Sequence, residues 1–115
     1  MSNFRDCGVV IILAMLAGCS SVSSLEDGKP EFSASTPKTP ARYAKCLMPK
    51  WQEINAATTS TETESGYRLL LNLDFVGAAA LANIDQDGSG SRVRIYKSSA
   101  IMGSGKWAEA ARSCL

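Results

Sequence analysis

The sequence predicts an α+β fold, a small two-layer sandwich in which two helices cover one face of three or four antiparallel strands. Two observations support this prediction. Apolar residues recur three and four positions apart near both ends of the predicted domain, which is typical of helices. Between these segments apolar and polar residues alternate, which is typical of strands with one buried face. The expected order is therefore helix, strands, helix.

The first helix is expected to begin near Pro40, with Tyr43 and Leu47 on its apolar face. Pro49 should break or kink this helix, because proline lacks the backbone N–H that a helix interior requires. Pro49 also suits the first position of a second helical segment, along which Trp51 would continue the apolar face. We therefore expect Trp51 to lie in the core rather than in a ligand site.

The strands are expected in the middle of the chain, between turn signals that contain glycine. The predicted segments are residues 58–64, which form an edge strand or a loop, and residues 67–73, 78–84 and 92–97. A closing helix over residues 106–115 would place Trp107 and Cys114 on one face, with Ser104 as a suitable N-cap.

The composition excludes several classes of protein. The chain has 115 residues, of which 20% are charged, and a formal net charge of +1, which suits one small globular domain. It contains no basic or acidic block, so nothing electrostatic favours a nucleic-acid partner. The longest apolar run is shorter than the roughly 20 residues that a transmembrane helix needs. A transmembrane protein is therefore not expected.

Residues 1–18 have the organisation of an export signal, because Arg5 precedes the apolar run of residues 9–17. The following Leu16-Ala17-Gly18-Cys19 resembles the lipobox of bacterial lipoprotein precursors, in which small residues let a signal peptidase reach the bond before a cysteine. The resemblance implies that residues 1–18 are removed. It says nothing about the domain that follows.

The same resemblance implies a diacylglyceryl thioether on Cys19, whose palmitate-type acyl chains hold the protein at the membrane. In enterobacteria-like sorting an Asp after this cysteine retains a lipoprotein in the inner membrane. Ser20 occupies that position, so we expect an outer-membrane lipoprotein with its domain in the periplasm. The alternatives are a plain secretory signal with an incidental cysteine and an uncleaved hydrophobic anchor.

Residues 19–39 are rich in Ser, Thr, Pro, Gly and charge, which predicts a flexible tether after the acylated cysteine. A tether of about 20 residues has a root-mean-square span of about 25 Å. Residues 40–115 would then form the α+β domain.

Cysteine usage predicts one disulfide. Cys7 would leave with the signal and Cys19 would be acylated, so Cys46 and Cys114 remain to pair in an oxidising compartment. Closing a loop of about 70 residues stabilises a fold by about 4 kcal/mol. The alternatives, a metal pair and a redox-active pair, are disfavoured because the chain has no His and the two thiols are far apart in sequence.

Residues 85–90 resemble the start of an EF-hand calcium loop, with oxygen donors at positions one, three and five and glycine at position six. Tyr96 stands where the bidentate Glu of that loop belongs, so we predict a hairpin turn and no metal site. A weak calcium contact through Asp85 and Asp87 stays open. Residues 103–106, Gly-Ser-Gly-Lys, resemble part of a phosphate loop. The other residues of that motif are missing, so we do not expect a nucleotide site there.

The protein is not expected to be an enzyme or to carry a cofactor. Acid–base and nucleophilic catalysis in such a chain would need an activating base, and no His is present. Glu62 and Glu64 would share a face of an edge strand, where two carboxylates usually form ion pairs with nearby cationic side chains.

One group of residues suggests binding, because strand alternation would place three arginines and an aromatic ring on the open face of the sheet. The candidate residues are Arg68, Arg92, Arg94 and Tyr96. Lipopolysaccharide phosphates, peptidoglycan carboxylates or an acidic protein partner would suit such a patch. The alternative is a solvated face on which the arginines pair across strands with Glu62 and Glu64.

These observations predict a non-enzymatic envelope lipoprotein, a tethered binding or accessory module of an outer-membrane or periplasmic assembly. A second hypothesis is an inhibitor or immunity lipoprotein that neutralises a toxin, a phage factor or a cell-wall hydrolase. An exposed loop inserted into an enzyme cleft would favour that hypothesis, and residues 85–91 and 98–105 are candidates for it.

Overall fold

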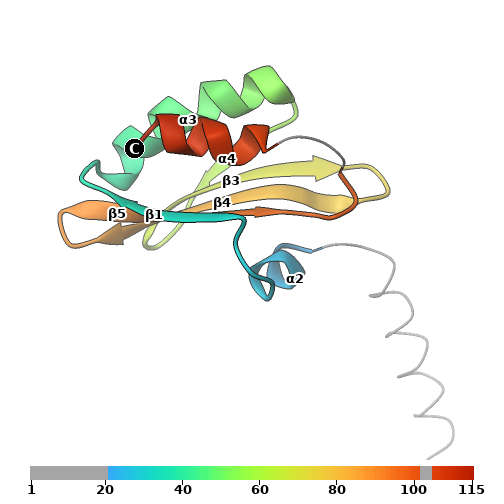
Figure 1. The fold of residues 1–115 in the computed structure, drawn as a ribbon, viewed down its shortest axis with the longest axis horizontal. Coiled ribbons are helices and arrows are strands. Elements are labelled where there is room, and N and C mark those ends of the chain that lie inside the picture. The colour runs from blue at the N-terminus through green and yellow to red at the C-terminus, as the bar shows by residue number, and fades with distance from the viewer. Residues whose placement is uncertain (1–20, 102–104) are drawn as a thin grey trace, which may run out of the picture.

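The computed structural model describes residues 21–101 and 105–115, which form a five-stranded antiparallel sheet and three helices (Figure 1). The elements in chain order are α2 (Val22–Glu26), β1 (Phe32–Thr36), α3 (Pro40–Ile54), β2 (Thr59–Glu62), β3 (Gly66–Leu73), β4 (Gly77–Asp87), β5 (Gly90–Lys97) and α4 (Lys106–Ser113). The predictions for the signal peptide 1–18, for Cys19 and for Ser104 lie outside the described residues.

The predicted α+β class is confirmed, but the predicted number of strands is wrong. The strand order is β1-β5-β4-β3-β2, so the sheet contains the four predicted segments and β1 in addition. Strand β1 pairs with β5 from Phe32 opposite Ile95 to Thr36 opposite Ser91. The expectation of a flexible tether up to residue 39 is therefore wrong for residues 32–36.

Long-range contacts explain why this Ser- and Thr-rich segment is ordered. The guanidinium carbon of Arg112 lies 5.2 Å from the centre of the Phe32 ring. At the other end of β1 the Thr36 hydroxyl donates to the carbonyl of Leu115 at 3.2 Å, and Lys38 Nζ donates to the carbonyl of Cys114 at 2.6 Å. The edge strand is thus fixed by the C-terminal residues, which its own composition does not reveal.

Helices α3 and α4 lie together on one face of the sheet and enclose the core (Figure 1). Tyr43, Leu47 and Trp51 of α3 are fully buried, as the helical spacing predicts. The rings of Trp51 and Trp107 meet edge to face at 4.9 Å, and Trp51 Nε1 donates to the Trp107 carbonyl at 3.2 Å. The predicted disulfide is present, and Cys46–Cys114 joins α3 to the end of α4.

Pro49 does not break α3, which runs without interruption from Pro40 to Ile54. Because Pro49 has no backbone N–H, the carbonyl of Lys45 lacks its usual helical partner. Both residues are exposed, so this carbonyl can bond to water instead. Leu47 and Trp51 are buried on either side of Pro49, so packing against the sheet holds both halves of the helix in place. The prediction of a break or a second segment is wrong for this reason.

The predicted two-layer sandwich is not confirmed, because an unpredicted helix, α2, lies on the sheet face opposite α3 and α4 and contacts β4 and β5 (Figure 1). Its N-cap is Ser21, whose hydroxyl accepts a hydrogen bond from the backbone N–H of Ser24 at 3.1 Å. Within the described residues no helix is long and apolar enough to cross a membrane.

Candidate functional site

The candidate arginines lie on the sheet face that carries α2, which we call the α2 face. Arg68 on β3 pairs with Asn83 on β4, and Asn83 pairs with Arg94 on β5, so these three residues form one row across three strands. Arg92 lies two residues from Arg94 and therefore on the same face. The sequence prediction that these arginines share a face is confirmed by the strand register.

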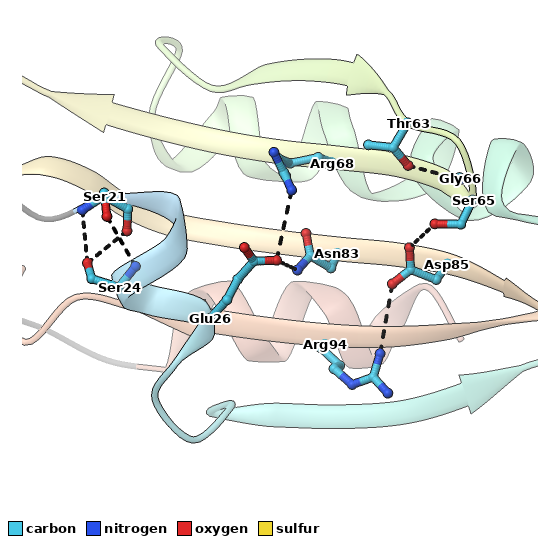
Figure 2. Close-up of polar contacts among 10 residues, drawn as sticks. All are labelled: Ser21, Ser24, Glu26, Thr63, Ser65, Gly66, Arg68, Asn83, Asp85 and Arg94. Atoms are coloured by element: carbon cyan, nitrogen blue, oxygen red, sulfur yellow. Dashed lines mark hydrogen bonds and ion pairs between the residues drawn. The ribbon is translucent and has the colours of Figure 1, made fainter.

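The side chain of Glu26 in α2 points toward Asn83 and Arg68 of this row (Figure 2). Its Oε2 accepts a hydrogen bond of 2.7 Å from Asn83 Nδ2, and the same oxygen lies 3.9 Å from Arg68 Nη2. We call Arg68, Asn83 and Arg94 the carboxylate row, because a carboxylate lies against its first two members in this structure.

Arg94 and Arg92 have other partners. Arg94 Nη1 lies 3.8 Å from Asp85 Oδ2, and Asp85 Oδ1 accepts a hydrogen bond of 2.6 Å from the Ser65 hydroxyl (Figure 2). Arg92 Nη1 donates to the Ser35 hydroxyl at 3.2 Å. The alternative prediction that Glu62 and Glu64 would pair with these arginines is wrong, because Glu26 and Asp85 form the ion pairs among the described residues.

These ion pairs are long and open to solvent. More than a third of each arginine side chain is exposed, 37% for Arg68 and 42% for Arg94. Exposed pairs of this kind typically contribute less than about 1 kcal/mol to stability. Arg68 Nε, in contrast, is buried and has no hydrogen-bond partner among the described residues. The row therefore keeps an unused donor as well as weakly held charges.

Tyr96 does not serve as the exposed aromatic that the sequence predicts. Only 7% of Tyr96 is accessible, and its cross-strand neighbour Leu81 is fully buried on the same face. Helix α2 contacts both strands that carry these side chains. Leu81 and Tyr96 thus form an apolar floor beside the carboxylate row, and alternation in β5 alone could not show that Tyr96 is buried on this face.

The Asp-rich segment forms the predicted hairpin. Asp87 pairs with Gly90 across a turn in which Gly88 has a φ of 61°, as the Asp-Gly pattern predicts. Asp85 lies in β4 rather than in a loop and is engaged by Ser65 and Arg94. Among the described residues no group of three or more His, Cys, Asp or Glu side chains is placed to hold a metal ion.

Sequence reasoning missed two residues of interest. Glu26 falls in the segment predicted as tether, so its docking on the carboxylate row left no signal in the pattern. Phe75, in the turn between β3 and β4, is fully exposed and has a φ of 68°. A bulky residue with a positive φ is rare. A phenylalanine between Asp74 and Val76, just before Gly77, was the available signal for it.

A shallow groove between α3 and α4 is lined by residues of both charges, among them Lys50, Glu53, Lys106 and Glu109. Two lysines and two glutamates thus line this groove, and their charges largely offset one another.

No family model, no curated protein and no solved structure matches the chain.

Proposed function

We propose that the protein is a non-enzymatic lipoprotein of the bacterial envelope that is anchored through Cys19 and binds an envelope partner on its α2 face. The lipobox Leu16-Ala17-Gly18-Cys19 supports the anchor and, with Ser20 after it, outer-membrane delivery. The observation that carries the binding role is the carboxylate row, in which two arginines flank an amide on one face of the sheet. Such an arrangement favours anionic groups over neutral ones.

The position of α2 also supports an envelope role. Only Ser20 separates Cys19 from Ser21, the N-cap of α2. Two extended residues span about 7 Å. An acylated Cys19 would therefore hold the α2 face close to the membrane surface while α2 is docked, rather than at the end of a tether of 20 residues.

The anchor is tested by comparing the wild type with Cys19→Ala in a native envelope. We expect the wild type in the outer-membrane fraction, with an N-terminal mass that includes the acyl chains, and the variant outside that fraction at its polypeptide mass. An unmodified wild-type Cys19 would contradict the anchor.

The binding role is tested by placing a photo-crosslinking side chain at Arg92 and, as a matched control on the opposite side, at the exposed Gln52 of α3. We expect a stoichiometric adduct from position 92 and none from position 52. Mass spectrometry of the adduct then separates a protein partner from peptidoglycan or lipopolysaccharide. Equal capture from both positions would contradict a binding site on the α2 face.

Phe75 favours a second candidate, an inhibitor or immunity lipoprotein. A fully exposed aromatic at a hairpin tip resembles the anchors that dominate tight interfaces. The hairpin with Phe75 is better suited to enter an enzyme cleft than residues 85–91, whose turn is polar. A crosslinker at position 75 that captures a toxin or a cell-wall hydrolase would favour this function over the first.

A further inference from the structure

We propose that the carboxylate row is a binding site for an acidic peptide and that Glu26 of α2 occupies this site as an internal substitute until such a peptide displaces it. The inference rests on the proposed binding role of the α2 face and names its ligand class and its regulation. Three features of the structure carry it: the contacts of Glu26, the unused donor of Arg68 and the apolar floor on the same face of the sheet.

The first feature is that the row already accepts a carboxylate. Glu26 Oε2 takes the 2.7 Å hydrogen bond from Asn83 Nδ2 and faces Arg68 Nη2 at 3.9 Å (Figure 2). The latter distance is too long for a hydrogen bond, so the charge of Arg68 is only partly used. The geometry that holds Glu26 would hold a carboxylate of another chain in the same way.

The second feature is that Glu26 does not saturate the site. A guanidinium binds a carboxylate most strongly through two parallel N–H groups. Nε and Nη2 form one such pair in Arg68, yet Nε is buried without a hydrogen-bond partner among the described residues and Nη2 is 3.9 Å from the nearest carboxylate oxygen. A ligand that engages both groups after α2 has left would therefore bind better than Glu26 does.

The third feature indicates a peptide rather than a bare anion. Val22 and Leu25 are the partly buried residues of α2. Val22 precedes Leu25 by three residues and Glu26 by four, so the three side chains fall within about 100° of the helix circumference. Leu81 and Tyr96 form the apolar floor on this face of the sheet. The surface under α2 thus combines apolar and carboxylate recognition, so we infer a ligand with an apolar residue directly before a Glu.

Helix α2 is suited to displacement. It has five residues, and each is exposed or only partly buried. Helices of this length are marginal in water without tertiary support. A tethered competitor weakens the binding of an external ligand, because that ligand can bind only during the fraction of time in which the site is free. Glu26 thus acts as an intramolecular brake on binding.

The test uses the mature chain from residue 19, isotopically labelled, and observes the Nε–Hε signal of Arg68 and the side-chain amide signal of Asn83 by NMR. The probe is a synthetic peptide of residues 21–31 added in trans, with a Glu26→Gln version of that peptide and inorganic phosphate as comparison ligands. We expect the acidic peptide to shift both signals and the other two ligands to shift them at least fivefold less at equal concentration.

Two variants of the protein sharpen the test. Glu26→Gln should bind the acidic peptide about two- to fivefold more tightly, because the internal competitor loses its charge. Arg68→Gln should bind it at least tenfold more weakly. Arg42→Gln, on the exposed side of α3, removes the same charge far from the site and should bind as the wild type does.

Several outcomes would overturn the proposal: equal binding of the acidic peptide and its Gln version, phosphate that matches the acidic peptide, or a Glu26→Gln variant with unchanged affinity. If Arg68→Gln does not fold, the Arg68 signal in the wild type and the Glu26→Gln comparison still decide. A failure of anchoring at Cys19 would contradict the envelope assignment but would not change these binding results. Failure of the anchor and failure of the peptide site are therefore distinguishable.

Discussion

The two faces of the sheet differ in what covers them. One face is covered by α3 and α4, with 15 and 8 residues, which bury two tryptophans and are joined by the Cys46–Cys114 disulfide. The other face carries the five residues of α2, which contacts β4 and β5, and it holds the buried Leu81 and Tyr96 beside a row of charged and polar side chains. The helices, the tryptophans and the disulfide that stabilise the fold are therefore concentrated on the first face.

The largest effect is expected on the helix-covered face, from Trp51→Ala. Trp51 is fully buried, packs against Trp107 and donates to its carbonyl. Removal of a buried tryptophan side chain costs about 3–5 kcal/mol, and we expect the upper part of that range. Urea denaturation measures the change, with the exposed Gln52→Ala on the same helix as control. A loss below about 2 kcal/mol would contradict a single core on this face.

Removal of the disulfide is expected to have the next largest effect. A double Cys46→Ala, Cys114→Ala variant should lose about 3–4 kcal/mol of unfolding free energy, because the bridge restrains a sequence separation of 68 residues in the unfolded chain. Denaturation with and without reductant measures the same quantity in the wild type. A wild type that is indifferent to reductant would contradict this prediction.

Leu81→Ala probes the opposite face. Leu81 is fully buried on the face that carries α2, and a helix of five residues that contacts β4 can settle into space left by a lost side chain. We therefore expect a loss of about 2 kcal/mol, at the low end for a buried leucine. Hydrogen exchange should show faster exchange in α2 and unchanged exchange in α3. Equal loosening of both helices would contradict the independence of the two faces.

Tyr43 makes the helix-covered face sensitive to alkali. Burial raises the pKa of Tyr43 above its ordinary value of 10.0, and its hydroxyl donates to the carbonyl of Ala111 at 2.5 Å. Above pH 10 the unfolded chain loses this proton and the folded chain keeps it, so stability falls as pH rises, by about 1.4 kcal/mol per pH unit from this group. Tyr43→Phe should remove that slope in denaturation measured between pH 10 and pH 11.

The smallest effect is expected from Arg92→Gln. The Arg92 side chain bonds Ser35 at the surface, and substitutions of this kind change stability by less than about 0.5 kcal/mol. Thermal unfolding should be nearly unchanged, although capture of a partner from the α2 face should fall. A large loss of stability would show that β1 depends on this contact.

The sequence predicted well what depends on local patterns. Helical spacing predicted α3 and α4, and alternation in β5 placed Val93 and Ile95 on one face and the two arginines Arg92 and Arg94 on the other. The two cysteines left to pair predicted the disulfide. It could not predict β1, because a Ser- and Thr-rich segment becomes a strand only through pairing with β5 and contacts with the C-terminal residues.

Only part of the candidate site could be predicted, because local patterns fix the face of each strand residue but not the packing of distant segments. Which arginines share a face follows from the strand period, and the structure confirms it for Arg68, Arg92 and Arg94. The docking of Glu26 depends on where α2 packs, and a five-residue helix with no strong apolar stripe gives no sign of that in its sequence.

The position of Cys46 within α3 has a further consequence, for proteolysis. The stretch from Cys46 to Cys114 contains β2 to β5 and α4, so a single cut in any of its loops leaves both fragments joined through sulfur. A nicked molecule of this kind would keep its full mass on a gel until reductant is added. A cut between α2 and β1 lies outside the segment that the disulfide encloses. Only cleavage on the N-terminal side of Cys46 can therefore release the domain from an attachment at its N-terminus.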